Sequence, residues 1–293
     1  MATTQPSAMP EAPPRRRGIL WLAAAVVLTA ALGLAAEMSR DDSAAQAREQ
    51  ENDEATREEL LGFGWAPVES ATARGLAAER GVEALMAERS FQLPGGNGLI
   101  SASPPDPSAA TRALAIVDEE LRRLPDGFVA AAGLWRVVLC EGLREGDDVI
   151  PSLPNYRHTL LLDVRAEPAY LRRLVHHEVF HFVDFAEDGM VLADRRWEAL
   201  NRTGFSYGYG GRDMRGPEAT PMREDLPGFV SLYATSALEE DKAEIFAFMM
   251  ARPTAMRRLA ARDEVIAAKM AYVTSVVAAL APHVDESFWR NLR

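Results

Sequence analysis

Three of the five histidines in this 293-residue chain lie in one short stretch, LRRLVHHEVFHFVDF, at residues 171–185. Within it, His177, Glu178 and His181 form the pattern H-E-x-x-H. Side chains four positions apart lie one above the other on a helix, so both imidazoles could bind one Zn²⁺ ion. Glu178 lies beside them, where its carboxylate could act as general base on a metal-bound water. His176 points to another face and is expected either to support a ligand from outside or to be structural.

The histidines alone do not distinguish a zinc site from an amphipathic core helix that happens to contain histidine. A catalytic zinc site ordinarily has three protein ligands and a water molecule, so a third ligand is required elsewhere. Asp184 is near in sequence, but it lies about 10 Å from His177 along an unbroken helix and cannot comfortably meet the same metal. We therefore expect Asp184 to support the site by orienting a neighbouring group.

The segment YATSALEEDKAEIFAF, at residues 233–248, contains a better candidate for the third ligand. Glu240 and Glu244 are four positions apart and share one side of a predicted helix. One carboxylate could bind zinc while the other accepts the N–H of a ligating imidazole and fixes its orientation. A solvated acidic helix face explains Glu239 and Asp241 instead. The spacing therefore selects Glu240 as the ligand and Glu244 as the outer support.

Taken together, the two segments resemble a known family. H-E-x-x-H-x-x-D, followed downstream by Y-(x)6-E-x-x-A-E-x-F, is similar to the zincin catalytic domain of anthrax lethal factor and related bacterial zinc-binding peptidases. The similarity covers about residues 110–255, although the insert at 182–239 is longer than expected for the toxin domain. The resemblance implies a His-His-Glu site for one zinc ion, Glu178 as the base in peptide-bond hydrolysis, and Tyr233 as a hydroxyl donor to the oxyanion.

Two other tyrosines, Tyr207 and Tyr209, lie in the Gly-rich part of the insert and could line the substrate cleft. The strand predicted at residues 158–164, just before the motif helix, could be an edge that pairs with an extended peptide substrate. Neither feature identifies a substrate, and the sequence gives no indication of the oligomeric state.

The elements that must position these side chains follow from apolar periodicity and composition. Residues 108–124 carry apolar side chains at helical spacing, and strands at 133–140 and 158–164 are rich in large apolar residues. The motif helix begins near Pro168, and mostly helical sequence follows residue 236. This order predicts one α+β, zincin-like domain in which a small sheet precedes the H-E-x-x-H helix and a helical C-terminal part.

The N-terminal part of the chain has a different composition. Residues 1–18 are Pro-rich, end in RRRG and are typical of a disordered tail. Residues 19–36 carry no charge and are just long enough to span a membrane, with the preceding arginines on the cytoplasmic side. A cleaved signal peptide is the main alternative, and twin-arginine export a third. Residues 37–103 are predicted to be an acidic spacer and linker, in which 75–91 could form a helix.

The remaining composition excludes some classes of function. The net charge of −11 makes the chain a poor partner for nucleic-acid phosphates. The single cysteine, Cys140, excludes an internal disulfide and a thiolate zinc cluster, and is expected to be buried on a strand.

We therefore expect residues 104–293 to be a zinc metallopeptidase domain that acts on peptides or proteins. It would be tethered to the bacterial cell membrane by residues 19–36 and lie outside the cytoplasm, or be secreted or periplasmic after signal cleavage. One alternative is an inactive zinc-binding envelope protein that binds a partner through the same cleft. The other is an anchored scaffold in which HHEVFH belongs only to the core.

Overall fold

The computed structural model describes residues 55–154, 156–188, 194–208, 210–214 and 218–292. The expected membrane segment at 19–36 and its flanking tail lie outside the described residues, so tethering stays a prediction. Within the described part, no helix combines the length and the apolar character that crossing a bilayer requires. The structure described below belongs to one compact unit, Leu60–Arg293.

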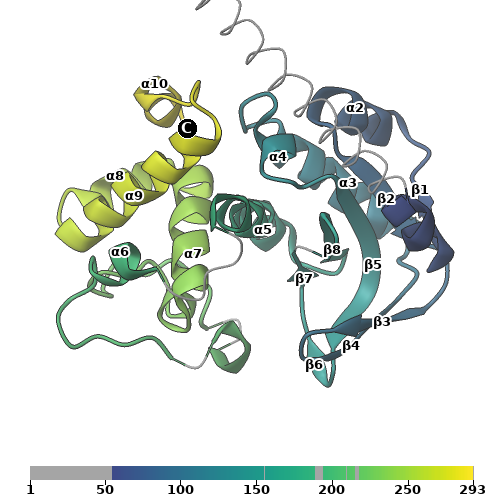
Figure 1. The fold of residues 1–293 in the computed structure, drawn as a ribbon, viewed down its shortest axis with the longest axis horizontal. Coiled ribbons are helices and arrows are strands. Elements are labelled where there is room, and N and C mark those ends of the chain that lie inside the picture. The colour runs from purple at the N-terminus through teal and green to yellow at the C-terminus, as the bar shows by residue number, and fades with distance from the viewer. Residues whose placement is uncertain (1–54, 155, 189–193, 209, 215–217, 293) are drawn as a thin grey trace, which may run out of the picture. The chain divides into compact units, whose positions relative to one another are not determined.

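An eight-stranded mixed sheet forms the first part of this unit, and the long strand β5 (Arg136–Glu145) is its centre (Figure 1). The first half of β5 pairs in parallel with β2 (Glu83–Ala87) on one side and with β8 (Thr159–Asp163) on the other. The strands expected at 133–140 and 158–164 are thereby confirmed as β5 and β8.

The other strands run antiparallel to their neighbours. The second half of β5 pairs with β4 (Gly98–Ser103) and β6 (Asp148–Val149). β1 (Trp65–Pro67), β3 (Phe91–Gly95) and β7 (Ser152–Leu153) extend the sheet beyond β2, β4 and β8. β8 is therefore paired on both sides, so the expectation that it forms a free edge is wrong. Among the described strands, β7 takes the outer place.

The predicted linker differs from the structure, because β1 to β4 all lie within residues 65–103. The helix expected at 75–91 ends early: α2 (Ala71–Arg80) is followed by Gly81, whose φ of 69° is a left-handed conformation that terminates helices. The next residues form β2, since their apolar side chains find a partner strand in β5. Local periodicity does not reveal that long-range pairing.

Both faces of the central strands are buried, which explains their nearly continuous apolar sequence. Val137 of β5 faces a large core shared with the helices, whereas Val138 and Cys140 face a second core. That second core contains Trp65 and Phe91, whose rings meet edge to face with centroids 5.2 Å apart. Cys140 is fully buried, as predicted.

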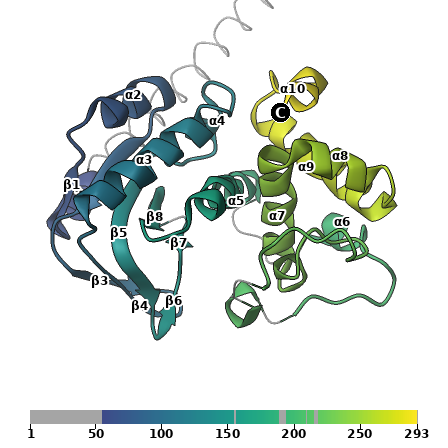
Figure 2. The same cartoon turned by 180° about the vertical axis from the view of Figure 1, so that it is seen from behind.

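Three helices are in contact with the sheet or with each other across the large core: α2, α3 (Pro107–Leu121) and α5 (Pro168–Asp188). The Asp106 side chain accepts the N–H of Ala109 at 2.9 Å and so caps the start of α3. α5 is the motif helix and begins at Pro168, as expected. It passes between the β7–β8 side of the sheet and α7 (Figures 1 and 2).

The C-terminal part is helical, with α7 (Leu238–Ala251), α8 (Pro253–Ala260), α9 (Glu264–Leu280) and α10 (Glu286–Asn291). Every residue from 241 to 250 is buried, because α7 packs against α5 on one side and α9 on another. The predicted mixed α+β architecture is confirmed, and α5 with α7 forms the pair of helices that carries both sequence motifs.

Candidate metal centre

The pairing of α5 with α7 brings together the three residues selected from the sequence as metal ligands. Nε2 of His177 lies 3.2 Å from Nε2 of His181 and 3.1 Å from Oε2 of Glu240. The distance from His181 Nε2 to the same carboxylate oxygen is 3.5 Å. Tetrahedral zinc with bonds of about 2.0–2.1 Å separates its ligand atoms by about 3.3–3.4 Å. The three donor atoms therefore have the identity and the spacing that one zinc ion requires.

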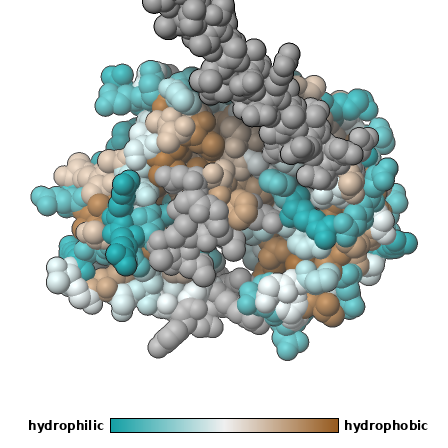
Figure 3. All heavy atoms as spheres, viewed as in Figure 1, coloured by the Kyte–Doolittle hydropathy of each residue, from teal (hydrophilic) through white to brown (hydrophobic). Residues whose placement is uncertain are grey.

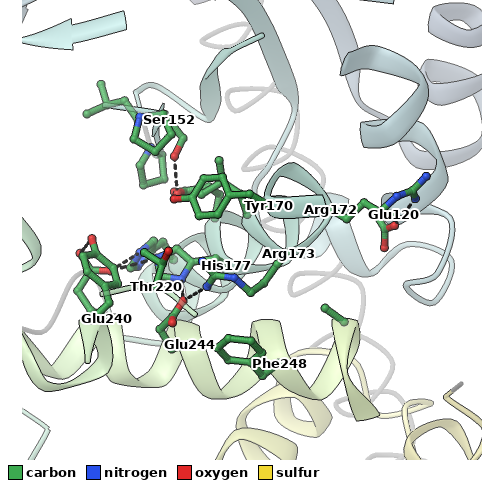
Figure 4. A pocket seen from close by; sticks show the side chains of 18 of the residues that line it. Glu120, Ser152, Tyr170, Arg172, Arg173, His177, Thr220, Glu240, Glu244 and Phe248 are labelled. Atoms are coloured by element: carbon green, nitrogen blue, oxygen red, sulfur yellow. Dashed lines mark hydrogen bonds and ion pairs between the residues drawn. The ribbon is translucent and has the colours of Figure 1, made fainter. Parts of the chain in front are cut away.

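Glu244 holds His177 from the opposite side of the imidazole ring, as Figure 4 shows. Nδ1 of His177 lies 3.0 Å from Oε1 of Glu244, and the Ser231 hydroxyl donates to Oε2 at 2.6 Å. Arg173, one helical turn before His177, forms an ion pair with the same carboxylate. A proton on Nδ1 leaves the lone pair of Nε2 pointing toward Glu240, which is the tautomer that a metal ligand needs.

The carboxylates around His177 change its protonation. Burial by itself lowers the pKa of His177, but the hydrogen bonds to Glu240 and Glu244 outweigh it and raise the pKa to about 10. For the carboxyl group of Glu240, burial has the opposite effect and by itself raises the pKa. The bonds to His177 and His181 outweigh burial and hold the pKa of Glu240 well below its usual range. A proton on the imidazole and a cation compete for the same nitrogen, so metal binding must release protons.

Glu178 lies on α5 between the two histidines and is only 4% exposed. Its Oε1 accepts a hydrogen bond of 2.6 Å from the Ser152 hydroxyl of β7. Its Oε2 is buried and has no hydrogen-bond partner among the described residues. One oxygen of the expected base is thus held by the protein, and Glu178 lines the same cleft as the three candidate ligands. Nothing in the sequence pointed to Ser152.

Tyr233 begins a short 3-10 helix, η2 (Tyr233–Thr235), just before α7. Its hydroxyl donates to Oε1 of Glu240 at 2.8 Å, so it lies beside one of the three candidate ligands. The Gly-rich insert reaches the same point, because a Cβ at Gly211 would overlap both Glu240 and the Tyr233 hydroxyl. A side chain at this position would have to displace the Glu240 carboxylate or the Tyr233 hydroxyl, a close approach that sequence reasoning missed.

The sequence suggested only that Asp184 orients a neighbouring group, and the structure gives it a lysine as its partner. Its Oδ1 accepts from Nζ of Lys242 at 2.8 Å, and Asp194 lies 3.0 Å from the same ammonium group. The Lys242 side chain is fully buried. Asp184 therefore anchors α7 to α5 through a lysine that lies between Glu240 and Glu244, rather than bonding to a ligating histidine.

Asp241 corrects a second expectation, because it is fully buried instead of lying on a solvated helix face. Its Oδ2 accepts hydrogen bonds from Nζ of Lys269 at 2.6 Å, from the Tyr207 hydroxyl at 2.7 Å and from the Trp197 indole at 3.1 Å. Tyr207 belongs to this network and does not line the cleft around the metal ligands. Tyr209 lies outside the described residues.

His176 lies on the other face of α5, as expected, and is fully buried. Its Nε2 lies 2.9 Å from Oε2 of Glu120 on α3, and burial lowers its pKa, so it donates as a neutral imidazole. Glu120 also accepts from Arg123 at 2.8 Å and from Arg172 at 2.6 Å. Burial alone would raise the pKa of Glu120, but these three donors hold it at about 2.

This network predicts how stability depends on pH. The pKa of Glu120 falls from an ordinary 4.5 to about 2 on folding, so the ionised form stabilises the fold. The stabilisation is complete above about pH 4.5 and is lost as pH falls toward 2, to a total of about 3 kcal/mol. We expect Glu120→Gln to lower the free energy of unfolding at pH 7 and to flatten its decline between pH 4.5 and 2, as measured by urea unfolding.

The neighbouring Glu119 provides the control for this experiment. It also pairs with Arg172, at 2.8 Å, but its side chain is 61% exposed. Exposed pairs contribute little, so Glu119→Gln should follow the parent curve within about 0.5 kcal/mol. If the free energy of unfolding of Glu120→Gln declined between pH 4.5 and 2 as steeply as that of the parent, the buried carboxylate would not be the group that titrates.

The three candidate ligands line a cleft of about 1320 Å³. Its walls come from the β6–β7 segment, from α5, from α7 and from residues 220–222. Val149 and Phe185, two of the three exposed large apolar residues in the described part of the chain, line this cleft at 57% and 40% exposure. Apolar surface is visible at the β4–β6 end of the sheet in Figure 3. The cleft thus combines a polar floor with apolar walls.

Comparison with known proteins gives limited information about this chain. No family model matches the sequence, and no curated protein matches it. A solved structure from Bacteroides caccae, described as a "putative zinc-binding metallo-peptidase", is similar at 16% identity and a TM-score of 0.44. The match covers 77% of this chain and 93% of that one. A likeness this distant leaves the assignment of chemistry to the geometry of the site itself.

Proposed function

We propose that this chain is a zinc-dependent metallopeptidase that holds one zinc ion on His177, His181 and Glu240. The observation that carries the proposal is the meeting of these three donor atoms, from two separate motifs, at the spacing that zinc requires. A structural zinc site is usually closed by four protein ligands, whereas the three ligands found among the described residues, at the floor of a cleft, leave a position for a reactant.

The protein groups around the ligands have the chemistry that peptide hydrolysis needs. A bound zinc ion supplies a Lewis acid that increases the acidity of water and polarises a carbonyl group. Oε2 of Glu178, which has no protein partner among the described residues, accepts the proton of the attacking water and returns it to the leaving amine. The Tyr233 hydroxyl, now bonded to Glu240, donates to the substrate oxygen as negative charge develops there.

The cleft is suited to an extended peptide. β7 is the outer strand beside the ligands; among the described residues its strand partner is β8 alone, and both of its residues line the cleft. A peptide placed along this edge could form backbone hydrogen bonds. Val149 and Phe185 would then contact apolar side chains of the peptide on either side of the site.

Metal analysis combined with a peptide-library assay tests this function on the purified full-length chain. We expect one zinc ion per chain and cleavage of peptides that is lost after treatment with a chelator and restored by added zinc. The physical reason is that removal of the ion leaves three ligands without the Lewis acid that activates water.

The failed outcomes have distinct meanings. A chain that holds no stoichiometric zinc, even when zinc is supplied, would end the metallopeptidase proposal. A chain that binds zinc but cleaves nothing in the library would instead be the partner-binding protein that lacks hydrolytic activity.

A further inference from the structure

The Glu178 carboxylate has two different environments at its two oxygens. Oε1 accepts the Ser152 hydroxyl at 2.6 Å, a length typical of a strong bond to an ionised carboxylate. Oε2 has no hydrogen-bond partner among the described residues, although Glu178 is only 4% exposed. A buried carboxylate oxygen without a partner is costly, so such a group is retained where it serves a purpose.

The fold fixes the position of Ser152 firmly. β7 pairs with β8 through Ser152 and Leu162, and the N–H of Asp163 donates to the carbonyl of Pro151 at 2.9 Å. Adjacent residues of a strand face opposite sides. Leu153 packs against the second core, so the Ser152 side chain is directed to α5, where it bonds to Oε1 of Glu178; Figure 4 labels Ser152 and marks its hydrogen bond by a dashed line.

We propose that Ser152 is a positioning residue that holds Oε1 of Glu178, so that Oε2 alone faces the attacking water. This inference rests on the proposed function, because it requires Glu178 to be the base. The terminal torsion of a glutamate side chain is soft, so a carboxylate without a partner turns through a wide range of angles. A hydrogen bond from a rigid strand removes that freedom and keeps the acceptor oxygen within the narrow range of angles that proton transfer requires.

A second serine in the same site offers a matched comparison. Ser231 donates to Oε2 of Glu244 at 2.6 Å, the same length as the bond from Ser152 to Glu178. The carboxylate that it holds orients the ligand His177 instead of the base. Two equal hydrogen bonds therefore act on two different functions, namely proton transfer and metal binding, and these can be measured separately.

The experiment compares Ser152→Ala, Ser152→Thr and Ser231→Ala in the zinc-loaded full-length chain. We expect Ser152→Ala to lower kcat by about 10- to 100-fold, with KM and zinc affinity close to those of the parent. Ser152→Thr keeps the hydroxyl and should recover kcat to within about threefold of the parent. Ser231→Ala should instead weaken zinc binding by about 10-fold, as expected when the support of a ligand is lost.

A structural measurement that needs neither zinc nor substrate completes the test. Ser152→Ala and Glu178→Ala, made singly and together, give a double-mutant cycle on the equilibrium constant for unfolding. We expect the effect of Ser152→Ala to be smaller by about fivefold or more when Glu178 is already absent.

Either of two results would overturn the inference: no coupling between the two residues, or parent-like kcat in Ser152→Ala. Equal losses of kcat in the alanine and threonine variants would also contradict it, because the hydroxyl would then be irrelevant. Failure of the proposed function has a different signature. If the zinc-loaded parent cleaves no peptide, the function is wrong, and the cycle still decides whether Ser152 holds Glu178.

Discussion

Glu178→Gln is expected to lower kcat/KM for peptide cleavage by about 10²- to 10⁴-fold while zinc stays bound, because an amide cannot accept the proton of the attacking water. Glutamine has nearly the same shape and can still accept the Ser152 hydrogen bond at its carbonyl oxygen. The fold should therefore persist. The measurements are cleavage kinetics on a peptide identified from the library, zinc content of the purified variant, and circular dichroism.

Glu167→Gln is a suitable control for this variant. Glu167 also lines the cleft, but its carboxylate accepts the backbone N–H of Tyr170 at 3.0 Å, at the start of α5. Removing its charge tests whether the negative potential of the cleft matters in general, and we expect less than about a threefold change in kcat/KM. A Glu178→Gln variant that cleaves as fast as the parent would show that Glu178 is not the base.

Glu240→Ala is expected to weaken zinc binding by more than about 100-fold, because it removes a ligand. Loss of a residue that only supports a ligand costs at most about 100-fold in metal affinity. The variant leaves two imidazole ligands, His177 and His181, whose nitrogens are only 3.2 Å apart, and no carboxylate ligand. Titration against a chromophoric chelator of known affinity would measure the change.

The adjacent Glu239 separates ligation from general electrostatic attraction. It lines the same cleft, and burial raises its pKa, but it forms no hydrogen bond or ion pair with the histidines among the described residues. We expect Glu239→Ala to change zinc affinity by less than about threefold. Equal losses of zinc affinity in the two variants would mean that the site attracts the cation by charge alone and that Glu240 is not a ligand.

Several features of the site were predictable because they depend on local geometry. His177 and His181 share one helix face through their spacing, and so do Glu240 and Glu244. Arg173 lies on the same stripe as the two histidines, four positions before His177, and this signal could have identified it as the partner of Glu244. Any residue whose role depends on the period of its own helix can be placed from sequence.

Other features required the folded chain. Asp241 resembles a solvated residue in sequence, but it is buried because Lys269, on another helix, neutralises it. The pairing of β2 with β5 turned an expected helix and linker into part of the sheet. The distance along the chain from Asp241 to Lys269, or from β2 to β5, is not set by helix or strand geometry. The periodicity of a single segment therefore does not predict these pairings.

The sequence by itself selected the candidate metal ligands and the candidate base, and it predicted the mixed architecture and the helices that carry both motifs, because helical spacing is a property of a single segment. The tertiary structure decided which groups hold those residues in place. Ser152 reaches Glu178 from a strand, Glu120 binds His176 from α3, and Gly211 admits a loop against Glu240. These contacts join segments whose separation in the chain is arbitrary, and only the packing of α5 between the sheet and α7 brings them together.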